Sequence, residues 1–317
     1  MEKDARIYVA GHRGMVGSAI LRILESRGHT NLLTRTSGEL DLRDGRLVEE
    51  WFAEARPDYV IVAAAKVGGI LANNTRPAEF IYDNLAIQTN LIHQAYRHRV
   101  KKLLLLGSSC IYPRDCPQPI KEEYLLTGPL EKTNEWYAVA KIAGIKMCQA
   151  YRRQYGCDFI AAMPTNLYGP NDNFDLQSAH VLPALIRRFH EAKHTGVAPI
   201  LWGTGSPRRE FLHVDDCAEA CLLLMERYSG EEFVNVGAGK DIPIADLATL
   251  VAEVVEYRGA INWDRTKPDG TPRKIMDSSN MRQLGWQPQI SLKQGLQQTY
   301  EWYQSQQANA SAIHQSA

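Results

Sequence analysis

The sequence predicts an α/β protein in which a doubly wound parallel sheet carries a smaller, interleaved α/β region toward the C-terminus. Three observations support this class. Apolar strand patterns recur at 6–10 (RIYVA), 59–63 (YVIVA) and 102–106 (KLLLL). Long helical patterns separate them, and a glycine-rich turn follows the first strand directly. Strands that are apolar along their whole length are typical of a parallel sheet covered on both faces.

The predicted elements of the first half alternate strictly between strand and helix. Right-handed crossovers between parallel strands then give a doubly wound arrangement, whose ligands bind at the carboxyl ends of the strands. Strands are expected at 6–10, 31–35, 59–63, 102–106 and 159–163, and helices at 15–27, 77–99 and 134–155.

The local composition of the sequence changes after Pro164, where proline, asparagine and glycine begin to cluster. We expect residues 1–165 to form a dinucleotide-binding (Rossmann) domain, to which 210–236 returns. Residues 166–209 and 237–305 are expected to bind the substrate, and 306–317 to be a frayed polar tail. An aspartate of the segment Glu210–Asp216 is expected to cap the apolar helix that follows.

Composition narrows the class of protein. The 36 basic and 36 acidic side chains cancel, which argues against a general polyanion-binding surface and gives no reason to expect a nucleic-acid partner. No apolar run is long enough to span a bilayer, and the charged start (MEKD) is unlike a signal peptide, so no membrane association is expected. The six cysteines have no metal-ligand spacing, which favours reduced thiols, a cytosolic location and no bound metal.

The turn after the first strand has the spacing Gly-x-x-Gly-x-x-Gly. Glycines at these positions allow a tight turn and a close approach of the backbone to a pyrophosphate at a helix N-terminus. The alternative is a turn that binds nothing, but its place between the first strand and the first helix favours dinucleotide binding. The residues are Gly11, His12, Arg13, Gly14, Met15, Val16 and Gly17.

Arginine replaces the acidic residue that often ends the second strand of NAD-binding proteins. Arg35 at that position, together with Arg13, suits the 2′-phosphate of NADP, although both could be ordinary surface arginines. Asp41 and Leu42 are candidates for the adenine edge. The small residues Ala63–Ala65 would let a cofactor lie against the strand ends, or could simply allow close helix packing.

A tyrosine and a lysine one helical turn apart, Tyr137 and Lys141, are the main candidates for acid-base chemistry. A nearby ammonium is expected to lower the pKa of the phenol toward the physiological range. Ser108, after the fourth strand, could orient a substrate carbonyl. Cys110 could abstract an acidic proton, although a lone cysteine is more often a small apolar filler.

Taken together, these motifs resemble the extended short-chain dehydrogenase/reductase family over nearly the whole chain. The resemblance rests on the glycine turn, on Ser108 with the Tyr137–Lys141 pair, and on Asn166–Pro170. Within that family, the segments 63–70, 106–113, 137–144 and 163–174 are most similar to enzymes that epimerise C3 and C5 of a GDP-linked 4-keto-6-deoxy sugar and then reduce C4.

This resemblance implies site roles that spacing alone does not give. Cys110 would be the base and His180 the acid of epimerisation, whereas Tyr137, Lys141 and Ser108 would serve reduction by NADPH. The GDP-sugar would contact Arg188, Trp202, Arg209 and Asp277. Further cofactor contacts are implied for Leu106, Gly107, Ser109, Pro164, Thr165, Asn166, Leu167 and His180.

Two other functions remain open at this point. One is an epimerase or reductase for a different sugar nucleotide, and the other is a non-catalytic NADP-binding regulator, which would not need the intact Ser108, Tyr137 and Lys141. A dehydratase is disfavoured because 130–136 lacks the adjacent Asp-Glu pair of those relatives. The resemblance also implies a homodimer formed through the helices at 77–99 and 134–155.

Overall fold

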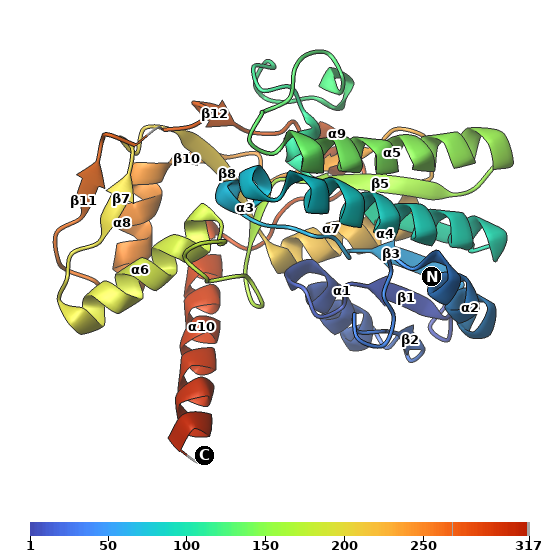
Figure 1. Ribbon diagram of the computed structural model, residues 1–317, viewed down its shortest axis with the longest axis horizontal. Helices are drawn as coiled ribbons and strands as arrows, with labels where there is room; N and C mark the ends of the chain where they lie inside the picture. The colour runs from blue at the N-terminus through green and yellow to red at the C-terminus, as the bar shows by residue number, and fades with distance from the viewer. Residues whose placement is uncertain (268, 316–317) are drawn as a thin grey trace.

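The computed structural model describes residues 1–267 and 269–315 and has two layered parts (Figure 1). The larger part is a six-stranded, wholly parallel sheet in the order β2-β1-β3-β4-β5-β9. This confirms the predicted α/β class with a doubly wound parallel sheet. Its strands are β1 (Ile7–Ala10), β2 (Leu32–Leu33), β3 (Tyr59–Val62), β4 (Lys102–Leu106), β5 (Phe159–Pro164) and β9 (Val234–Val236).

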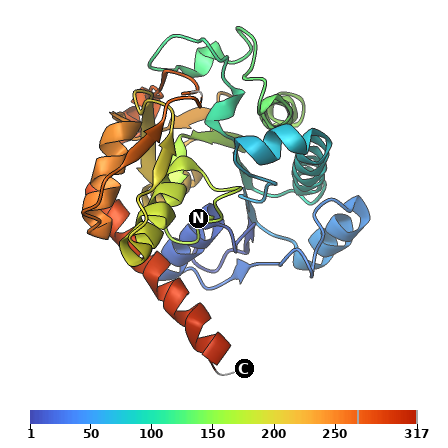
Figure 2. The ribbon, with the colours of Figure 1, turned by 60° about the vertical axis from the view of Figure 1, so that its left-hand side comes forward.

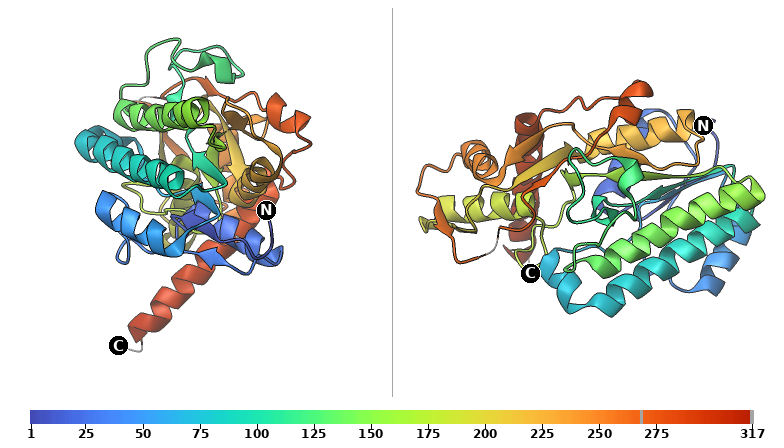
Figure 3. Two further views of the ribbon diagram at one scale, coloured as in Figure 1. Left: turned by 90° about the vertical axis from the view of Figure 1, so that its right-hand side faces the viewer. Right: turned by 90° about the horizontal axis from the view of Figure 1, so that it is seen from above.

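Helices cover both faces of this sheet. Alternate residues of a strand point to opposite faces, and here both sets are apolar and need to be covered. In β1, Ile7 and Val9 pack toward one apolar cluster, and Tyr8 and Ala10 toward another. The first cluster includes helices α1 (Met15–Ser26), α7 (Val214–Arg227) and α9 (Ser279–Gln283), and the second includes α2 (Gly45–Ala55), α4 (Pro77–Arg97) and α5 (Glu135–Tyr155). The long helices α4 and α5 lie side by side (Figure 3).

The smaller part has its own apolar cluster and two small sheets. In the larger of these, β8 (Arg208–His213) pairs with β6 (Asn166–Tyr168), β10 (Asp241–Pro243) and β12 (Arg273–Lys274). The other joins β7 (Ile200–Trp202) to β11 (Asn262–Asp264). The remaining helices are α3 (Ile70–Thr75), α6 (Val181–Thr195), α8 (Ile244–Val255) and α10 (Leu292–Gln315), with short 3₁₀ turns η1 (Ser109–Ile111) and η2 (Glu122–Tyr124).

The segment 210–236 is divided between the two parts. Helix α7 packs against α1, and β9 extends the large sheet. Strand β8, however, belongs to the smaller sheet. The expected aspartate cap is also wrong, because His213 is the N-cap and its Nδ1 accepts a hydrogen bond from the backbone N–H of Asp215 at 3.3 Å. Asp216 instead accepts two backbone N–H groups, from Gln289 and Ile290.

The expected frayed tail covers 306–317, but α10 continues without a break to Gln315 (Figure 2), and residues 316–317 lie outside the described residues. Its first turns are fixed by Leu296, Tyr300 and Tyr303, which are buried in the cluster of the smaller part. Once a helix has been nucleated by packing, each further residue adds a hydrogen bond at low cost, even in a polar sequence. Within the described residues, no helix has the length and apolar character needed to cross a membrane.

Candidate active site

The glycine turn between β1 and α1 has the close-packed geometry that its spacing predicts. Gly11 adopts a φ of 84°, and a Cβ there would lie 2.6 Å from the backbone nitrogen of Ala64. A Cβ on Gly17 would lie 2.2 Å from the carbonyl oxygen of Gly11. Gly14 is the N-cap of α1, which leaves the first N–H groups of that helix free for an anion.

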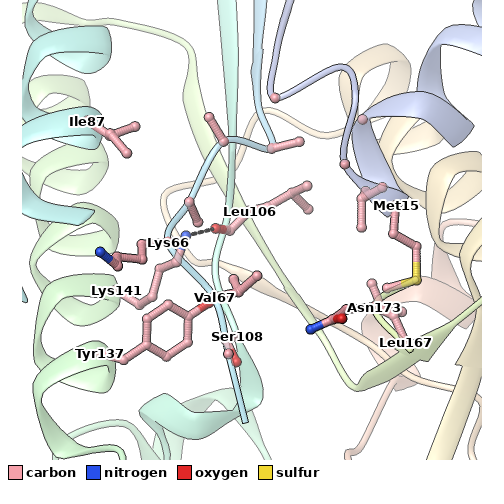
Figure 4. A pocket seen from close by; sticks show the side chains of 18 of the residues that line it. Met15, Lys66, Val67, Ile87, Leu106, Ser108, Tyr137, Lys141, Leu167 and Asn173 are labelled. Carbon is pink, nitrogen blue, oxygen red and sulfur yellow. Dashed lines mark hydrogen bonds between the residues drawn. The ribbon is translucent and has the colours of Figure 1, made fainter. Parts of the chain in front are cut away.

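A cavity of about 660 Å³ opens beside this turn, at the carboxyl ends of the central strands. Figure 4 shows Met15 and Leu167 on one side of it, and Tyr137, Lys141 and Lys66 on the other. Most of the predicted cofactor residues line it: Gly11, Gly14, Met15, Val16, Gly17, Arg35, Asp41, Leu42, Ala63, Ala65, Leu106, Gly107, Ser108, Ser109, Lys141, Pro164, Thr165, Asn166, Leu167 and His180. His12, Arg13 and Cys110 lie outside its lining.

The tyrosine and the lysine meet at one end of the cavity. The Nζ atom of Lys141 lies 5.8 Å from the centre of the Tyr137 ring and donates a hydrogen bond to the carbonyl oxygen of Leu106 at 2.8 Å (Figure 4). Burial lowers the pKa of Lys141 to about 8. The side chain is therefore still mostly charged at neutral pH.

The expectation that Lys141 lowers the pKa of Tyr137 is wrong for this geometry. Burial raises the pKa of the phenol above its usual range, the nearby Cys110 raises it further, and a side-chain hydrogen bond with Ser108 opposes the rise. The ammonium of Lys141 is directed to the carbonyl of Leu106 rather than to the phenol. Tyr137 is therefore protonated at neutral pH, which suits a proton donor.

Cys110 lies in the η1 turn, two residues after Ser108. Ser108 is the N-cap of this turn and accepts a hydrogen bond from the backbone N–H of Cys110 at 3.4 Å. Only 7% of Cys110 is exposed, and this burial raises the pKa of its thiol. The charges of Lys274 and Lys141 act in the opposite direction, as does the hydrogen bond with Ser108. The thiol therefore has cations nearby that favour its thiolate.

His180 lies on the cavity wall at the N-cap position of α6. Its pKa is lowered by burial, so that the imidazole is mostly neutral at neutral pH. A neutral imidazole carries one N–H and one free nitrogen, and can therefore give or accept a proton.

One end of the cavity contains two arginines with different partners. The guanidinium of Arg35 lies 5.9 Å from the centre of the Trp51 ring and makes one hydrogen bond, to the carbonyl of Thr34. Arg43, by contrast, holds both carboxylate oxygens of Asp41, at 2.9 and 2.8 Å. Arg35 thus keeps most of its donors available for a phosphate, whereas Arg43 does not.

Several lining residues were given no role by the sequence prediction. Lys66 binds Glu79 at 2.5 Å and Asp83 at 3.0 Å, and Asp83 also contacts Arg43 at 3.4 Å. This network joins the chain after β3 to α4 along one wall. Sequence patterns give no signal for Asp83, because a polar residue on a long helix normally faces solvent. The other lining residues not predicted are Ser37, Leu40, Val67, Gly68, Ile87, Asn171, Asp172, Asn173 and Ser178.

Asp172 lies in the loop between β6 and α6, where burial disfavours the ionised form of its carboxyl group. Its Oδ2 atom is buried without a hydrogen-bond partner, and its pKa is raised to about 7. The pKa of this carboxyl group is about 4 in the unfolded chain and about 7 in the folded protein. Between these two pH values the folded state binds more protons than the unfolded state. Ionisation of this group therefore destabilises the fold as the pH rises through that window.

We expect Asp172→Asn to raise the melting temperature by several degrees at pH 8 and by less at pH 5. The amide keeps the shape and the hydrogen bond from the backbone N–H of Asn173, but cannot ionise. Thermal unfolding at both pH values measures this. Asp175→Asn is the control, because hydrogen bonds lower the pKa of Asp175, so its substitution should give no gain at pH 8. An equal change at both pH values would contradict the assignment.

The four residues expected to contact the GDP-sugar do not line this cavity. Arg188 lies on α6 and Trp202 ends β7 with 67% of its surface exposed. Arg209 is on β8. Asp277 accepts hydrogen bonds from the N–H and hydroxyl of Ser279 and pairs with Arg282. All four belong to the smaller part of the molecule or to the chain leading into α9.

Among the described residues, no group of acidic, histidine or cysteine side chains is arranged to hold a metal.

Comparisons with known proteins agree with this geometry. "Putative GDP-L-fucose synthase 2" of Arabidopsis thaliana is 66% identical over 96% of this chain and 93% of its own length. "GDP-L-fucose synthase" of Escherichia coli K12 is 54% identical over 94% of this chain and 96% of its own. A GDP-L-fucose synthetase from Naegleria fowleri, solved with NADP bound, has a TM-score of 0.89 and 28% identity over 96% of this chain and 95% of its own.

A family model supplies the classification. The model described as "NAD dependent epimerase/dehydratase family" matches residues 7–237, from the first strand of the large sheet to the end of its last strand. This match includes the glycine turn, Ser108, and the Tyr137–Lys141 pair, so the site residues fall within the matched region. The chain therefore belongs to the NAD dependent epimerase/dehydratase family.

Proposed function

We propose that this protein converts GDP-4-keto-6-deoxy-D-mannose to GDP-L-fucose, by epimerisation at C3 and C5 followed by NADPH-dependent reduction of the 4-keto group. The observation that carries the proposal is the arrangement at one end of the cavity. Tyr137, Lys141, Ser108 and His180 line the cavity, and the backbone N–H of Cys110 donates to the hydroxyl oxygen of Ser108. The relatives named GDP-L-fucose synthase support the choice of substrate.

The cavity suits NADP in both shape and charge. The glycine turn brings the backbone and the free N–H groups of α1 to the position of a pyrophosphate. Arg35 has donors available for a 2′-phosphate, and Arg13 is the second arginine proposed for it. Lys141 is proposed to hold the nicotinamide ribose. When bound, NADPH supplies the hydride that reduces C4.

In the reduction, Tyr137 is the proton donor to the C4 oxygen. Its raised pKa keeps the phenol protonated at neutral pH until negative charge develops on that oxygen. The nearby ammonium of Lys141 then stabilises the phenolate that remains. Ser108 directs its hydroxyl to the same oxygen, so that two donors stabilise the developing charge.

In the epimerisations, the C4 ketone acidifies the C–H bonds at C3 and C5, because the carbanion formed on either side is an enolate. Cys110, as the thiolate, removes the proton, and His180 returns one on the other face of the sugar. The enolate oxygen occupies the position of the C4 oxygen in the reduction. Tyr137 and Ser108 therefore stabilise both reactions from one place.

The smaller part of the molecule is proposed to hold the GDP-sugar. Residues 1–165 would bind the cofactor, with 210–236 returning to that domain, and 166–209 and 237–305 would bind the substrate. Arg188, Trp202, Arg209 and Asp277 are the proposed contacts. The separate apolar cluster and small sheets around β8 support a distinct region of this kind.

Turnover with defined keto-sugars tests the proposed substrate. With NADPH present, GDP-4-keto-6-deoxy-D-mannose should be consumed and the product should match GDP-L-fucose by NMR. UDP-4-keto-6-deoxy-D-glucose is the comparison substrate and should react at least about 100-fold more slowly, because it lacks both the guanine and the manno-configured sugar. A preference for the UDP-sugar, or NADPH binding without any turnover, would refute the proposal.

Arg35→Ala should weaken NADPH binding about 10- to 100-fold and NADH binding by less than about twofold. One or two charge-assisted hydrogen bonds to the 2′-phosphate account for a loss of this size, and NADH has no such phosphate. Fluorescence titration with both nucleotides measures the ratio. Arg46→Ala is the control, because that exposed arginine pairs with Glu50 on α2. Equally weakened binding of both nucleotides would show that Arg35 does not bind the 2′-phosphate.

We also propose a homodimer formed through α4 and α5, in a reducing, cytosolic setting. Large side chains on these helices are exposed: Tyr82 by 64%, Trp136 by 46% and Tyr155 by 47%. All six cysteines are unpaired, which suits a reducing compartment.

Sedimentation of the proposed homodimer should give about twice the chain mass of 35.7 kDa. Tyr82→Glu combined with Trp136→Glu should give the monomer, and unchanged sedimentation would argue against this interface.

A further inference from the structure

The chain after β3 contacts the loop before α6 at Gly69. The backbone N–H of Gly69 donates a hydrogen bond of 3.0 Å to the carbonyl oxygen of Ser178. Ser178 lines the cavity and lies two residues before His180, the N-cap of α6. Helix α3 begins directly after Gly69, at the junction of the two parts of the molecule (Figure 1). This contact therefore joins the chain after β3 to the backbone that carries the imidazole of His180.

Position 69 has no room for a side chain. A Cβ atom on Gly69 would lie 3.1 Å from the carbonyl oxygen of Ser178 and 3.2 Å from that of Ala179, both closer than ordinary van der Waals contact. The second oxygen belongs to the peptide group that joins Ala179 to His180, so moving it moves the Cα atom of His180. Gly69 has a φ of −65°, which any residue can adopt. The close approach, and not the backbone conformation, therefore requires glycine here.

The segment that ends at Gly69 is held in place by two asparagines. Asn73 is only 5% exposed, and its Nδ2 atom donates to the carbonyl oxygens of Gly68 at 2.7 Å and Gly69 at 3.1 Å. Asn84 on α4 accepts from the backbone N–H of Lys66 at 3.1 Å and donates to its carbonyl oxygen at 3.0 Å. These hydrogen bonds limit how far Gly69 can move away from the loop before α6.

The loop that carries Ser178 is also held by several hydrogen bonds. The Oδ1 atom of Asp175 accepts from the N–H groups of Gln177 and Ser178 and from the hydroxyl of Ser178. The amide of Asn173 donates to the oxygen of that hydroxyl at 2.9 Å, and the N–H of Ala179 donates to the carbonyl oxygen of Asp175 at 2.7 Å. Because both segments are held, the contact between them sets the position at which α6 begins.

We propose that Gly69 and Asn73 are positioning residues for His180. They hold the backbone against which the loop before α6 rests, and they thereby place the imidazole for proton return to the enolate. This rests on the proposed function, in which His180 is the acid of epimerisation. In that step the enolate carbon takes a proton from the imidazole ring, the electron pair of the enolate forms the new C–H bond, and water returns a proton to the ring.

A misplaced His180 has an effect that a general disturbance of the site does not have. In the proposed mechanism Cys110 still removes the proton at C3 or C5, its thiol exchanges with D₂O, and it returns deuterium to the same face of the sugar. The sugar then gains deuterium but keeps its configuration. Inversion needs a proton from His180 on the opposite face. The ratio of inversion to exchange therefore reports the placement of His180 and not the general integrity of the site.

The test is this ratio, measured with GDP-4-keto-6-deoxy-D-mannose in D₂O. The full-length protein is supplied with NADP⁺ so that no reduction follows, and NMR measures both deuterium content and configuration at C3 and C5. Gly69→Ala should slow inversion about 10- to 100-fold, the usual effect of misplacing a catalytic group by a fraction of its reach, and should slow exchange less than about threefold. Equal losses of exchange and inversion, or unchanged inversion, would overturn the inference.

A second pair of variants adds no atom between the two segments. Asn73→Asp keeps the shape of the side chain but removes the N–H donor to the carbonyls of Gly68 and Gly69, and should slow inversion about 5- to 50-fold while exchange persists. Asn74→Asp makes the same change at the exposed neighbouring residue and should leave both rates unchanged. An equal loss of exchange and inversion in Asn73→Asp, or the same loss in Asn74→Asp, would overturn the inference. Absence of exchange in the wild type would instead refute the proposed function.

Discussion

Replacing Tyr137 by phenylalanine is expected to slow reduction of the 4-keto group by about 10²- to 10⁴-fold, the usual range for loss of a general acid. The phenol is the proposed proton donor, and burial keeps it protonated at neutral pH. Phenylalanine preserves the edge-to-face contact with Phe80, so the site should keep its shape. Single-turnover measurement of NADPH oxidation gives the rate.

The epimerase half of the reaction separates a chemical effect from a structural one. Solvent exchange at C3 and C5 in Tyr137→Phe should fall much less than reduction, because Ser108 still stabilises the enolate oxygen. Tyr155→Phe, near the other end of the same helix, should leave both rates unchanged. Equal loss of exchange and reduction in Tyr137→Phe would contradict the assigned division of roles.

Replacing Cys110 by serine is expected to lower solvent exchange at C3 and C5 by at least about 10³-fold. A serine hydroxyl is a far weaker acid than a thiol and supplies almost no anionic base near neutral pH. The two side chains are similar in size, so NADPH binding and the melting temperature should change little. Deuterium incorporation, followed by NMR, measures the effect.

Another cysteine provides the matched control for this substitution. Cys157 is half-buried two residues after the end of α5, outside the turn that carries Ser108 and Cys110, and Cys157→Ser should retain full exchange. Cys110→Ser should also fail to form GDP-L-fucose while any reduction that remains yields a sugar without inverted centres. Persistent exchange at C3 and C5 in Cys110→Ser would remove this thiol as the base.

The fold was predictable where local patterns and tertiary packing agree. Strand β4 begins and ends at the predicted residues, and α4 and α5 lie within two residues of their predicted ends. The expected strand at 31–35 is reduced to two residues, because β2 is an edge strand that pairs only with β1. Helix α2 was not predicted.

The errors share a physical cause, which is that distant contacts decide them. His213 rather than an aspartate caps α7, and only the structure shows which side chain reaches the free N–H groups. Leu296 and its neighbours nucleate α10 so that the polar tail remains helical. Neither outcome is encoded within a short sequence window.

The site was predictable where a motif carries the chemistry. The glycine turn and the Tyr137–Lys141 spacing led to most of the cavity lining. The unpartnered Oδ2 of Asp172 and the ion pairs of Lys66 with α4 depend on burial, which periodicity does not report.

The most direct test of the central claim is one reaction in D₂O with unlabelled NADPH and GDP-4-keto-6-deoxy-D-mannose, followed by NMR of the product. The claim is that one cavity performs both epimerisations and the reduction. The predicted product is GDP-L-fucose with solvent deuterium at C3 and C5 and protium at C4, formed in equal amount to the NADPH oxidised. A reduced sugar that retains protium at C3 and C5 would contradict the claim.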